Sequence, residues 1–361
     1  MDDRNAQVGW TEAQWNRVRE EILQAWQRVR VAGSFLPIYG PLPPSTQVVP
    51  SEVLKPDGSV DDRATAALLE IALPVTLSRQ QIWEEDLSSA LLQFRRRATQ
   101  LGQLEDWFIF NGTYPSIASI ELSDNAQELA NEKKIGLPDY RPELPHLNAP
   151  DPTQRARISG TPTPIAGVSQ SLQIEGMRQR NPGSLGLIEA PRVERLGAEA
   201  EAWDKTPLNN DGLMRAIVKA INSLEDNGYV APYVCVFGRN PFEAAFTPIN
   251  NSTVLPRDRI EPLIGRELLH ASGIDIPPQG LDDLYKLNRE EWQSRGLLLS
   301  MANEPIDLAL AAEATPEFRQ VDLEGRYVFS VFERFALRIK DAKAIVPLMF
   351  ETPAEAEKPN P

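Results

Sequence analysis

Two stretches of the chain carry apolar residues at the spacing of an amphipathic helix. The first begins at Thr11, which forms the sequence pattern of a capping box with Gln14. It ends near Gly33, where glycines and prolines follow in GSFLPIYGPLPP. Its apolar positions are Trp15, Val18, Ile22, Trp26 and Val29. This pattern predicts a helix from Thr11 to near Gly33, with one buried face.

The second stretch is longer and predicts a rod-like helix over Glu84–Phe110. Its apolar positions are Leu87, Leu91, Phe94, Ala98, Leu101 and Phe108. The stripe meets Glu105 where a further apolar residue is expected. Such a helix is about 40 Å long, above the usual length in globular domains. Three consecutive arginines, Arg95, Arg96 and Arg97, fan over its surface. We expect ion pairs from them, along the rod or with a neighbouring molecule, rather than contacts with nucleic acid.

Between the two helices, residues 40–77 have the pattern of an extended arm. VLKPDGSVDD contains a hairpin signal at Asp57-Gly58, and the apolar run ALLEIALPVTL predicts the returning strand. Two strands alone are only marginally stable in water. The arm is therefore expected to lie on another surface, either of this chain or of a neighbour.

The periodicity is lost over residues 113–180, a proline-rich stretch that we interpret as a long insertion with extended backbone. Regular patterns then return. They predict a helix over Leu213–Leu224, a buried strand in PYVCVFG, a helix near Ile260–Leu269 and a strand over Leu297–Met301. From Tyr327 to Ile339 apolar and polar residues alternate, which predicts one long strand whose buried face is interrupted only by Glu333.

Charge and cysteine content narrow the class of protein. The net charge of −14 and a pI of about 4.8 argue against a surface built to bind nucleic-acid phosphates. The single cysteine, Cys235, excludes an internal disulfide framework. The N-terminus lacks an apolar signal region, and no run of about 18 apolar residues could span a membrane. We therefore expect a soluble, cytoplasmic protein with no nucleic-acid or membrane partner.

The sequence predicts no catalytic residues, no metal site and no cofactor. Two histidines, His146 and His270, and one cysteine do not make a Cys/His metal pattern. There is no glycine-rich phosphate loop or GxSxG motif. Cys235 lies in an apolar run without a basic neighbour, which indicates a core residue rather than a nucleophile. The adjacent carboxylates Glu105 and Asp106 diverge by about 100° on a helix and are not expected to converge on one ligand.

Four groups of motifs occur in the order found in one known protein family. The first is TEAQWNRVREEILQAW followed by IYGPL, and the second is IALPVTLSRQQIW followed by LEDWFIFNG. The third is GSLGLIEAP followed by LMRAIVKAINSLEDNGYVAPYVCVFG, and the fourth is FSVFERFALRIKDAKAIVPL. Together they cover most of the chain outside residues 113–180. In this collinear set the chain resembles the encapsulins, the linocin-type shell proteins of bacterial nanocompartments.

The resemblance implies an α+β chain with the major capsid fold of tailed phages. It assigns residues 1–39 to an N-terminal helix and its exit, and residues 40–77 to an extended arm (E-loop) that lies across an adjacent subunit. The peripheral domain would comprise its spine helix within 78–112, an insertion at 113–180 and a return segment at 181–206. The apical domain would span 207–304. Residues 305–350 would form C-terminal strands of the peripheral domain or arm, before a disordered tail at 351–361.

Three surfaces follow from the resemblance. The family docks a C-terminal cargo peptide between the N-terminal helix and the peripheral domain, and by position this groove would include Trp26, Val29, Arg30, Ser34, Phe35, Pro37 and Ile38. The alternative is that Trp26 and Val29 simply pack inward. A pore would be rimmed by Pro248, Ile249, Asn250, Asn251, Ser252 and Thr253, unless this loop is an ordinary surface turn. The arginines at 95–97 would contact a neighbouring subunit along the spine.

Some positions depart from the family pattern. Gly33, Ser34 and Pro37 replace residues that supply polar cargo contacts in many relatives. The flavin-binding aromatic positions of some relatives are not carried over to Trp83.

The implied function is a non-catalytic, self-assembling icosahedral shell that encloses a cargo enzyme, such as a peroxidase, ferritin-like or hemerythrin-like protein. The alternative is a phage or prophage major capsid protein enclosing DNA. A third hypothesis, an enzyme with protease-like activity, lacks a nucleophile–base pair in the sequence. Neighbouring genes for a terminase and portal would favour the phage hypothesis, and a cargo gene with a tail peptide the shell hypothesis.

Overall fold

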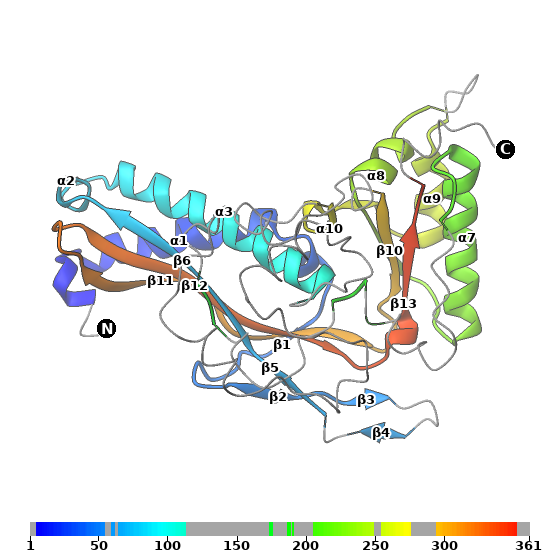
Figure 1. Cartoon of the computed structure of the whole chain (residues 1–361), viewed down its shortest axis with the longest axis horizontal. Helices are drawn as coiled ribbons and strands as arrows, with labels where there is room; N and C mark the ends of the chain where they lie inside the picture. The colour runs from blue at the N-terminus through cyan, green and yellow to red at the C-terminus, as the bar shows by residue number, and fades with distance from the viewer. Residues whose placement is uncertain are drawn as a thin grey trace, which may run out of the picture.

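A computed structural model describes residues 5–54, 59–61, 64–112, 173–175, 186–188, 190, 205–248, 254–275 and 294–351. Its central element is a five-stranded sheet in the order β1-β11-β12-β6-β7 (Figure 1). The strands are β1 Ile38–Tyr39, β6 Leu69–Leu77, β7 Gln173–Glu175, β11 Ile306–Val321 and β12 Tyr327–Ile339. β12 pairs antiparallel with both β11 and β6, while β1 runs parallel to β11 at the edge.

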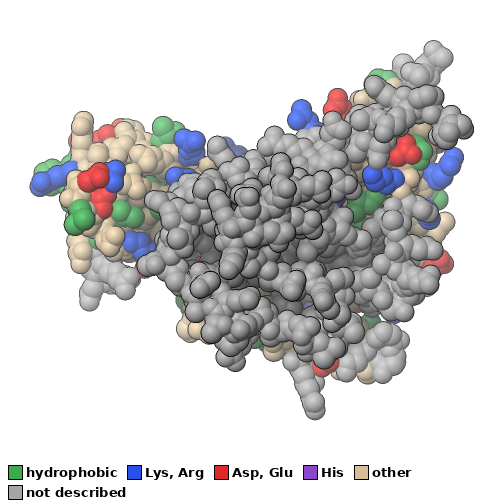
Figure 2. Space-filling view, in the orientation of Figure 1, with side chains coloured by type: hydrophobic (Ala, Val, Ile, Leu, Met, Phe, Trp, Pro, Cys, Tyr) green, Lys and Arg blue, Asp and Glu red, His purple; other side chains and the backbone are tan. Residues whose placement is uncertain are grey.

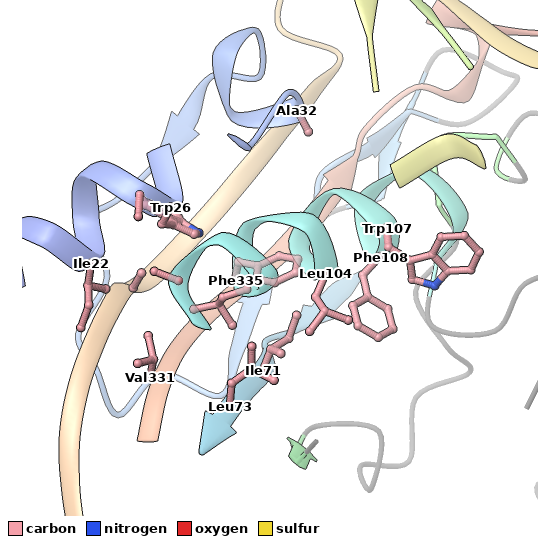
Figure 3. Close-up of a cluster of buried hydrophobic side chains, with 14 of the residues drawn as sticks. Ile22, Trp26, Ala32, Ile71, Leu73, Leu104, Trp107, Phe108, Val331 and Phe335 are labelled. Atoms are coloured by element: carbon pink, nitrogen blue, oxygen red, sulfur yellow. The ribbon is translucent and has the colours of Figure 1, made fainter. Parts of the chain in front are cut away.

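Two helices, α1 Glu12–Val29 and α3 Ser88–Asn111, cover one face of this sheet (Figure 1). Their apolar stripes and the inward side chains of the strands form one core. The side chains that meet there include Ile22 and Trp26 of α1, Leu104 and Phe108 of α3, Ile71 and Leu73 of β6, and Val331 and Phe335 of β12 (Figure 3). Burying one large apolar side chain contributes roughly 1.5–3 kcal/mol, so this layer holds both helices on the sheet.

The opposite face of the sheet carries the base of the arm. Here β2 Val48–Pro50 pairs with β5 Thr65–Ala67, and β3 Val53–Leu54 pairs with β4 Val60–Asp61. Val49 and Leu68 pack on small residues of β11 and β12. The arm base therefore lies on this chain's own sheet, one of the two alternatives that the sequence left open, while β3 and β4 extend away from the body (Figure 1).

A second sheet, in the order β13-β10-β8-β9, stands at the other end of α3 (Figure 1). Its strands are β8 Tyr233–Phe237, β9 Leu269–His270, β10 Arg295–Ser300 and β13 Ile345–Met349. Three helices, α7 Asn210–Asp226, α8 Arg239–Ala245 and α9 Pro256–Ile264, share a second core with it. β8 is apolar on both faces because it is covered on both, by these helices and by the first core.

The two sheets are joined through the C-terminal end of α3. The Asn111 side chain donates a 2.7 Å hydrogen bond to the carbonyl of Gly273 in α10 Ser272–Asp275. Val234 of β8 and Leu297 of β10 belong to the same core as α1 and α3. The spine is thus anchored in both parts of the molecule.

Several patterns are confirmed directly. Thr11 and Gln14 form the capping box at the start of α1. The helix at Leu213–Leu224 lies within α7, and the strand expected over Tyr327–Ile339 is β12 with the same bounds. The part of the chain that the structure describes contains no helix long and apolar enough to cross a membrane.

Three expected boundaries need correction. The spine helix begins at Ser88 rather than Glu84, because Leu87 takes a left-handed backbone (φ 53°) that separates α3 from the short α2 Arg79–Ile82. The helix near Ile260–Leu269 stops early because Gly265 is in the left-handed region at φ 72°, where glycine is favoured.

The third correction concerns the end of the chain. Residues 305–350 were all assigned to the peripheral domain or arm, yet β13 pairs antiparallel with β10 in the second sheet, Leu297 opposite Pro347. The long strand β11 within this range was not indicated by any pattern.

Other expectations lie outside the described residues. They are the Asp57-Gly58 turn, the insertion at 113–180 apart from β7, the segment at 181–206 except for residues 186–188, 190 and 205–206, and the tail from 352 onward.

Candidate docking groove and subunit surfaces

A groove lies between α1 and α3 on the helical face of the molecule. It encloses about 270 Å³ and is lined by Glu21, Gln24, Ala25, Arg28, Val29, Arg95 and Thr99. One wall is formed by successive turns of α1 and the other by one ridge of α3, since residues four apart share a helix face. Arg95 donates to Glu21 at 2.8 Å across the groove. The floor is apolar at Ala25 and Val29, and charges of both signs stand along the rim.

α1 and α3 approach each other closely at Gly102. A Cβ atom there would lie 2.7 Å from Val29 Cγ2 and 3.1 Å from the Trp26 carbonyl oxygen. Contacts under 3.0 Å require a shift of the neighbour, and Val29 is stiff because it is β-branched. Glycine is therefore what allows α1 to lie against α3 at this distance.

The residues predicted to dock a peptide differ widely in exposure. Trp26 is 0% exposed, and Arg30 and Phe35 are also buried. Val29 lines the groove, Ser34 and Ile38 are exposed, and Pro37 is half-buried. Trp26 therefore packs inward, which is the alternative that the sequence left open for this residue. The groove residues that the sequence missed lie on the same helix: Glu21, Gln24, Ala25 and Arg28, with Thr99 across from them.

Beneath the groove, the end of α1 is tied to α3 by charged groups that are all buried. Arg30 Nη2 lies 2.6 Å from Glu105 Oε1, with exposed side-chain fractions of 7% and 0%. The Arg30 guanidinium also stacks over the Trp26 ring at 3.9 Å from its centroid. A side chain at Gly33 would collide with this guanidinium, so the departure from the family pattern at Gly33 leaves room for Arg30.

Asp106 holds the turn that follows α1. Its carboxylate accepts hydrogen bonds from the backbone N–H groups of Val31 at 2.8 Å and Ala32 at 2.9 Å. As expected, Glu105 and Asp106 diverge on the helix, but both reach the same turn, one through Arg30 and the other through the backbone.

Burial raises the pKa of every carboxyl in this region. The pKa of Glu105 rises to about 8, mainly through burial and against the attraction of Arg30. That of Asp106 rises to about 7, because burial outweighs the hydrogen bonds from Val31 and Ala32. Glu333 on β12 is fully buried, neither of its oxygens has a hydrogen-bond partner, and its pKa lies well above the usual range.

The three spine arginines have different surroundings. Arg95 pairs with Glu21, Arg97 donates to Gln100 at 2.8 Å, and Arg96 is exposed. Arg95 thus makes an ion pair between two elements of one chain. On the face shown in Figure 2, the described Lys and Arg side chains are interspersed with Asp and Glu and gather into no single basic patch.

Two other expected surfaces are only partly described. Of the pore loop, Pro248 is described and exposed, and Ile249, Asn250, Asn251, Ser252 and Thr253 lie outside the described residues. Trp83 is 69% exposed, beside Arg79, whose guanidinium carbon lies 4.9 Å from the ring centroid.

The described residues give little support for catalysis. Burial raises the pKa of the Cys235 thiol, which keeps it protonated. His270 lies 3.8 Å from Asp275, and Asp275 in turn accepts the backbone N–H of Arg239 at 2.6 Å, a contact that caps α8. Among these residues no group of three His, Cys, Asp or Glu side chains is placed to hold a metal ion.

Comparison with known proteins gives matches among solved structures only. No family model matches the sequence, and no curated protein matches it significantly. The virus-like particle from Pyrococcus furiosus aligns over 94% of this chain and 100% of its own, with a TM-score of 0.51 and 11% identity. The capsid of an empty GTA particle aligns over 89% of both chains, with a TM-score of 0.49 and 13% identity.

The first of these matches establishes the fold. The whole subunit of a virus-like particle is superimposed on this chain, so the chain has the α+β, capsid-like fold of that subunit. The resemblance drawn from the sequence motifs is confirmed at this level.

Proposed function

We propose that this protein is the subunit of a self-assembling icosahedral shell, that the shell is an encapsulin nanocompartment in the cytoplasm, and that it encloses a cargo enzyme without catalysing a reaction itself. The observation that carries the proposal is the alignment over the full length of a virus-like particle subunit.

The arm supports self-assembly. Its base is fixed to the chain's own sheet, while Leu54 on β3 and Val60 on β4 are 39% and 56% exposed. An exposed, two-stranded extension has little stability by itself, and apolar side chains at its tip gain free energy when covered. We infer that the tip lies across a neighbouring subunit.

A non-catalytic role agrees with the chemistry of the described residues. The carboxyls with strongly raised pKa, Glu105, Asp106 and Glu333, are buried between the helices and the sheet. Cys235 is buried in the core of the second sheet. These environments are those of structural groups.

The groove between α1 and α3 is the proposed docking site for the cargo peptide. Its apolar floor at Ala25 and Val29 suits one or two small apolar side chains, and the exposed Arg28 at its rim favours an acidic residue beside them. A peptide that orders on binding needs only such a few anchors. This assignment replaces the set centred on Trp26 with residues that a peptide can reach.

The test is to purify the protein from its native cells and identify what is enclosed. Gln24→Trp fills the groove, and Gln27→Trp places the same change on an exposed position of α1 outside it. We expect shells from both variants, with cargo protein lost only from Gln24→Trp. Shells that contain genome-length DNA and no cargo enzyme would instead identify a phage capsid. Undiminished cargo in Gln24→Trp would reject the groove alone.

A further inference from the structure

Two interruptions of otherwise apolar patterns meet inside the protein. Glu105 breaks the stripe of α3, and Glu333 breaks the buried face of β12, where it lies between Val331 and Phe335 on the side that packs against the helices. Both residues are 0% exposed. They lie close enough that the negative charge of Glu105 raises the pKa of Glu333.

The polar atoms around this point are incompletely paired. Arg30 Nε, Trp26 Nε1, Glu105 Oε2 and both oxygens of Glu333 are buried without a hydrogen-bond partner. An unpaired buried carboxylate costs several kcal/mol, whereas a protonated carboxyl is neutral and can donate. A carboxyl in this position is therefore far more stable with its proton than without it.

The charges that face Glu333 come from two elements. Glu105 and Asp106 face it from α3, and Arg30 faces it from the end of α1. The indole N–H of Trp26 on α1 opposes the rise in its pKa. The strands beside it add no compensating cation. Glu333 pairs with Ile71 on β6, and the next residue of β12, Arg334, contacts Glu70. The exposed Glu313 lies on the flanking β11.

The cluster therefore contains one cation, Arg30, and three carboxyl groups, those of Glu105, Asp106 and Glu333. If all three are ionised, Arg30 neutralises one of them, through its 2.6 Å contact with Glu105, and two backbone N–H groups support Asp106. Arg30 and the indole N–H of Trp26 favour a negative charge on Glu333, but burial and repulsion from Glu105 outweigh them. Full ionisation would place a net charge of about −2 in the buried space between α1, α3 and the sheet, which burial and like-charge repulsion make unfavourable.

We propose that the cluster of Arg30, Glu105, Asp106 and Glu333 is a pH-sensitive latch, which holds the C-terminal end of α1 on the spine while it keeps its protons and loosens when alkaline solution removes them. The element that moves is the turn at Val31 and Ala32, whose backbone N–H groups are held on α3 by the carboxylate of Asp106. α1 is also one wall of the groove, so opening the latch changes that wall. An effect of pH on peptide docking therefore rests on the proposed function, whereas the latch does not depend on it.

The sign of the effect follows from linkage. The folded protein holds protons that the unfolded chain releases above the ordinary carboxyl pKa of about 4.3. Stability is therefore fully present below that pH and is lost as the pH rises through the folded-state values, about 7 for Asp106 and about 8 for Glu105. The latch is closed in mild acid and weakened near pH 8 to 9.

The variant Glu333→Gln tests the proposal, because the amide has the shape of the protonated acid and cannot ionise. We expect its melting temperature to equal that of the wild type at pH 5 and to exceed it by about 4 °C or more at pH 9. Glu313→Gln removes an exposed carboxyl of the same sheet and should follow the wild type at every pH. Parallel profiles of wild type and Glu333→Gln would overturn the proposal.

A second measurement needs no variant. Hydrogen exchange of the wild type, expressed as protection factors, should show residues 26–36 losing at least tenfold more protection between pH 6 and pH 9 than residues 217–224 of α7. Equal changes in the two segments would contradict the latch. Either result can be read on monomers, oligomers or shells, so it stands apart from whether the protein encloses cargo.

Discussion

The two faces of β12 each carry a charged side chain, but only one of these side chains has partners. Glu333 and Arg334 are neighbours in sequence, and because side chains alternate along a strand they enter opposite sides of the sheet. Toward the helices, Glu333 is buried without a partner. Toward the arm, Arg334 donates to the carbonyls of Pro44 and Thr46 and lies 3.2 Å from Glu70.

The arm face repeats this satisfied arrangement at Arg338. Its guanidinium makes two 2.6 Å hydrogen bonds with Asp307 and a third, at 2.9 Å, with the Pro50 carbonyl. Its ring contact with Tyr39 at 3.7 Å covers the remaining side. The comparison teaches that the charged groups on one face are paired with one another, whereas the other face holds buried carboxyls whose pKa is raised.

The largest expected effect comes from breaking the locked face. Arg338→Met leaves Asp307, 5% exposed at its side chain, with only Lys340 at 2.9 Å. Breaking a buried pair typically costs about 3–5 kcal/mol, and Lys340 should keep the loss near the lower end. Urea unfolding at pH 7 measures it. Arg326→Met, in the exposed turn after β11, serves as the control and should leave the midpoint unchanged.

A smaller effect is expected at the helix crossing on the other face. Gly102→Ala should destabilise the protein by roughly 1–3 kcal/mol through overpacking against Val29 and Trp26, partly offset by about 1 kcal/mol of helix propensity. Val29→Ala should remove most of that penalty in the double variant, a coupling that a double-mutant cycle measures. A stabilised Gly102→Ala variant would show that the helices are not held this closely.

The smallest effect on folding is expected at the surface. The Arg95–Glu21 pair is half exposed on the arginine side, and such pairs contribute about 0.5 kcal/mol or less. Arg95→Glu should therefore leave the unfolding midpoint nearly unchanged. If the spine arginines also meet a neighbouring subunit, Arg95→Glu with Arg96→Glu should reduce assembly while the secondary structure stays intact. Normal shells from this double variant would leave these arginines as plain surface.

Much of the fold follows from local pattern, and its limits have physical causes. α1, α7 and β12 were predicted because each has a regular apolar period, and β8 because it is a short apolar run bounded by turn residues. β11 was missed because IDLALAAEATPEFRQV is rich in alanine, contains Pro316, and has register shifts near Ala312 that break the alternation.

The site was harder to predict than the fold. The groove is made by polar residues on α1 and α3, and polar helix faces look alike whether or not another helix stands beside them. The latch did leave a signal, since Glu105 and Glu333 were the residues that interrupted their patterns. That they face one another depends on contacts between residues more than 200 positions apart, which no local pattern contains.

The central claim is that this fold assembles into a closed shell. Size-exclusion chromatography of the purified protein at pH 7, followed by negative-stain electron microscopy of the leading peak, tests it most directly. The account predicts particles of uniform size with icosahedral symmetry that elute near the void volume. A monomer or small oligomer under native conditions, with its secondary structure intact, would contradict it.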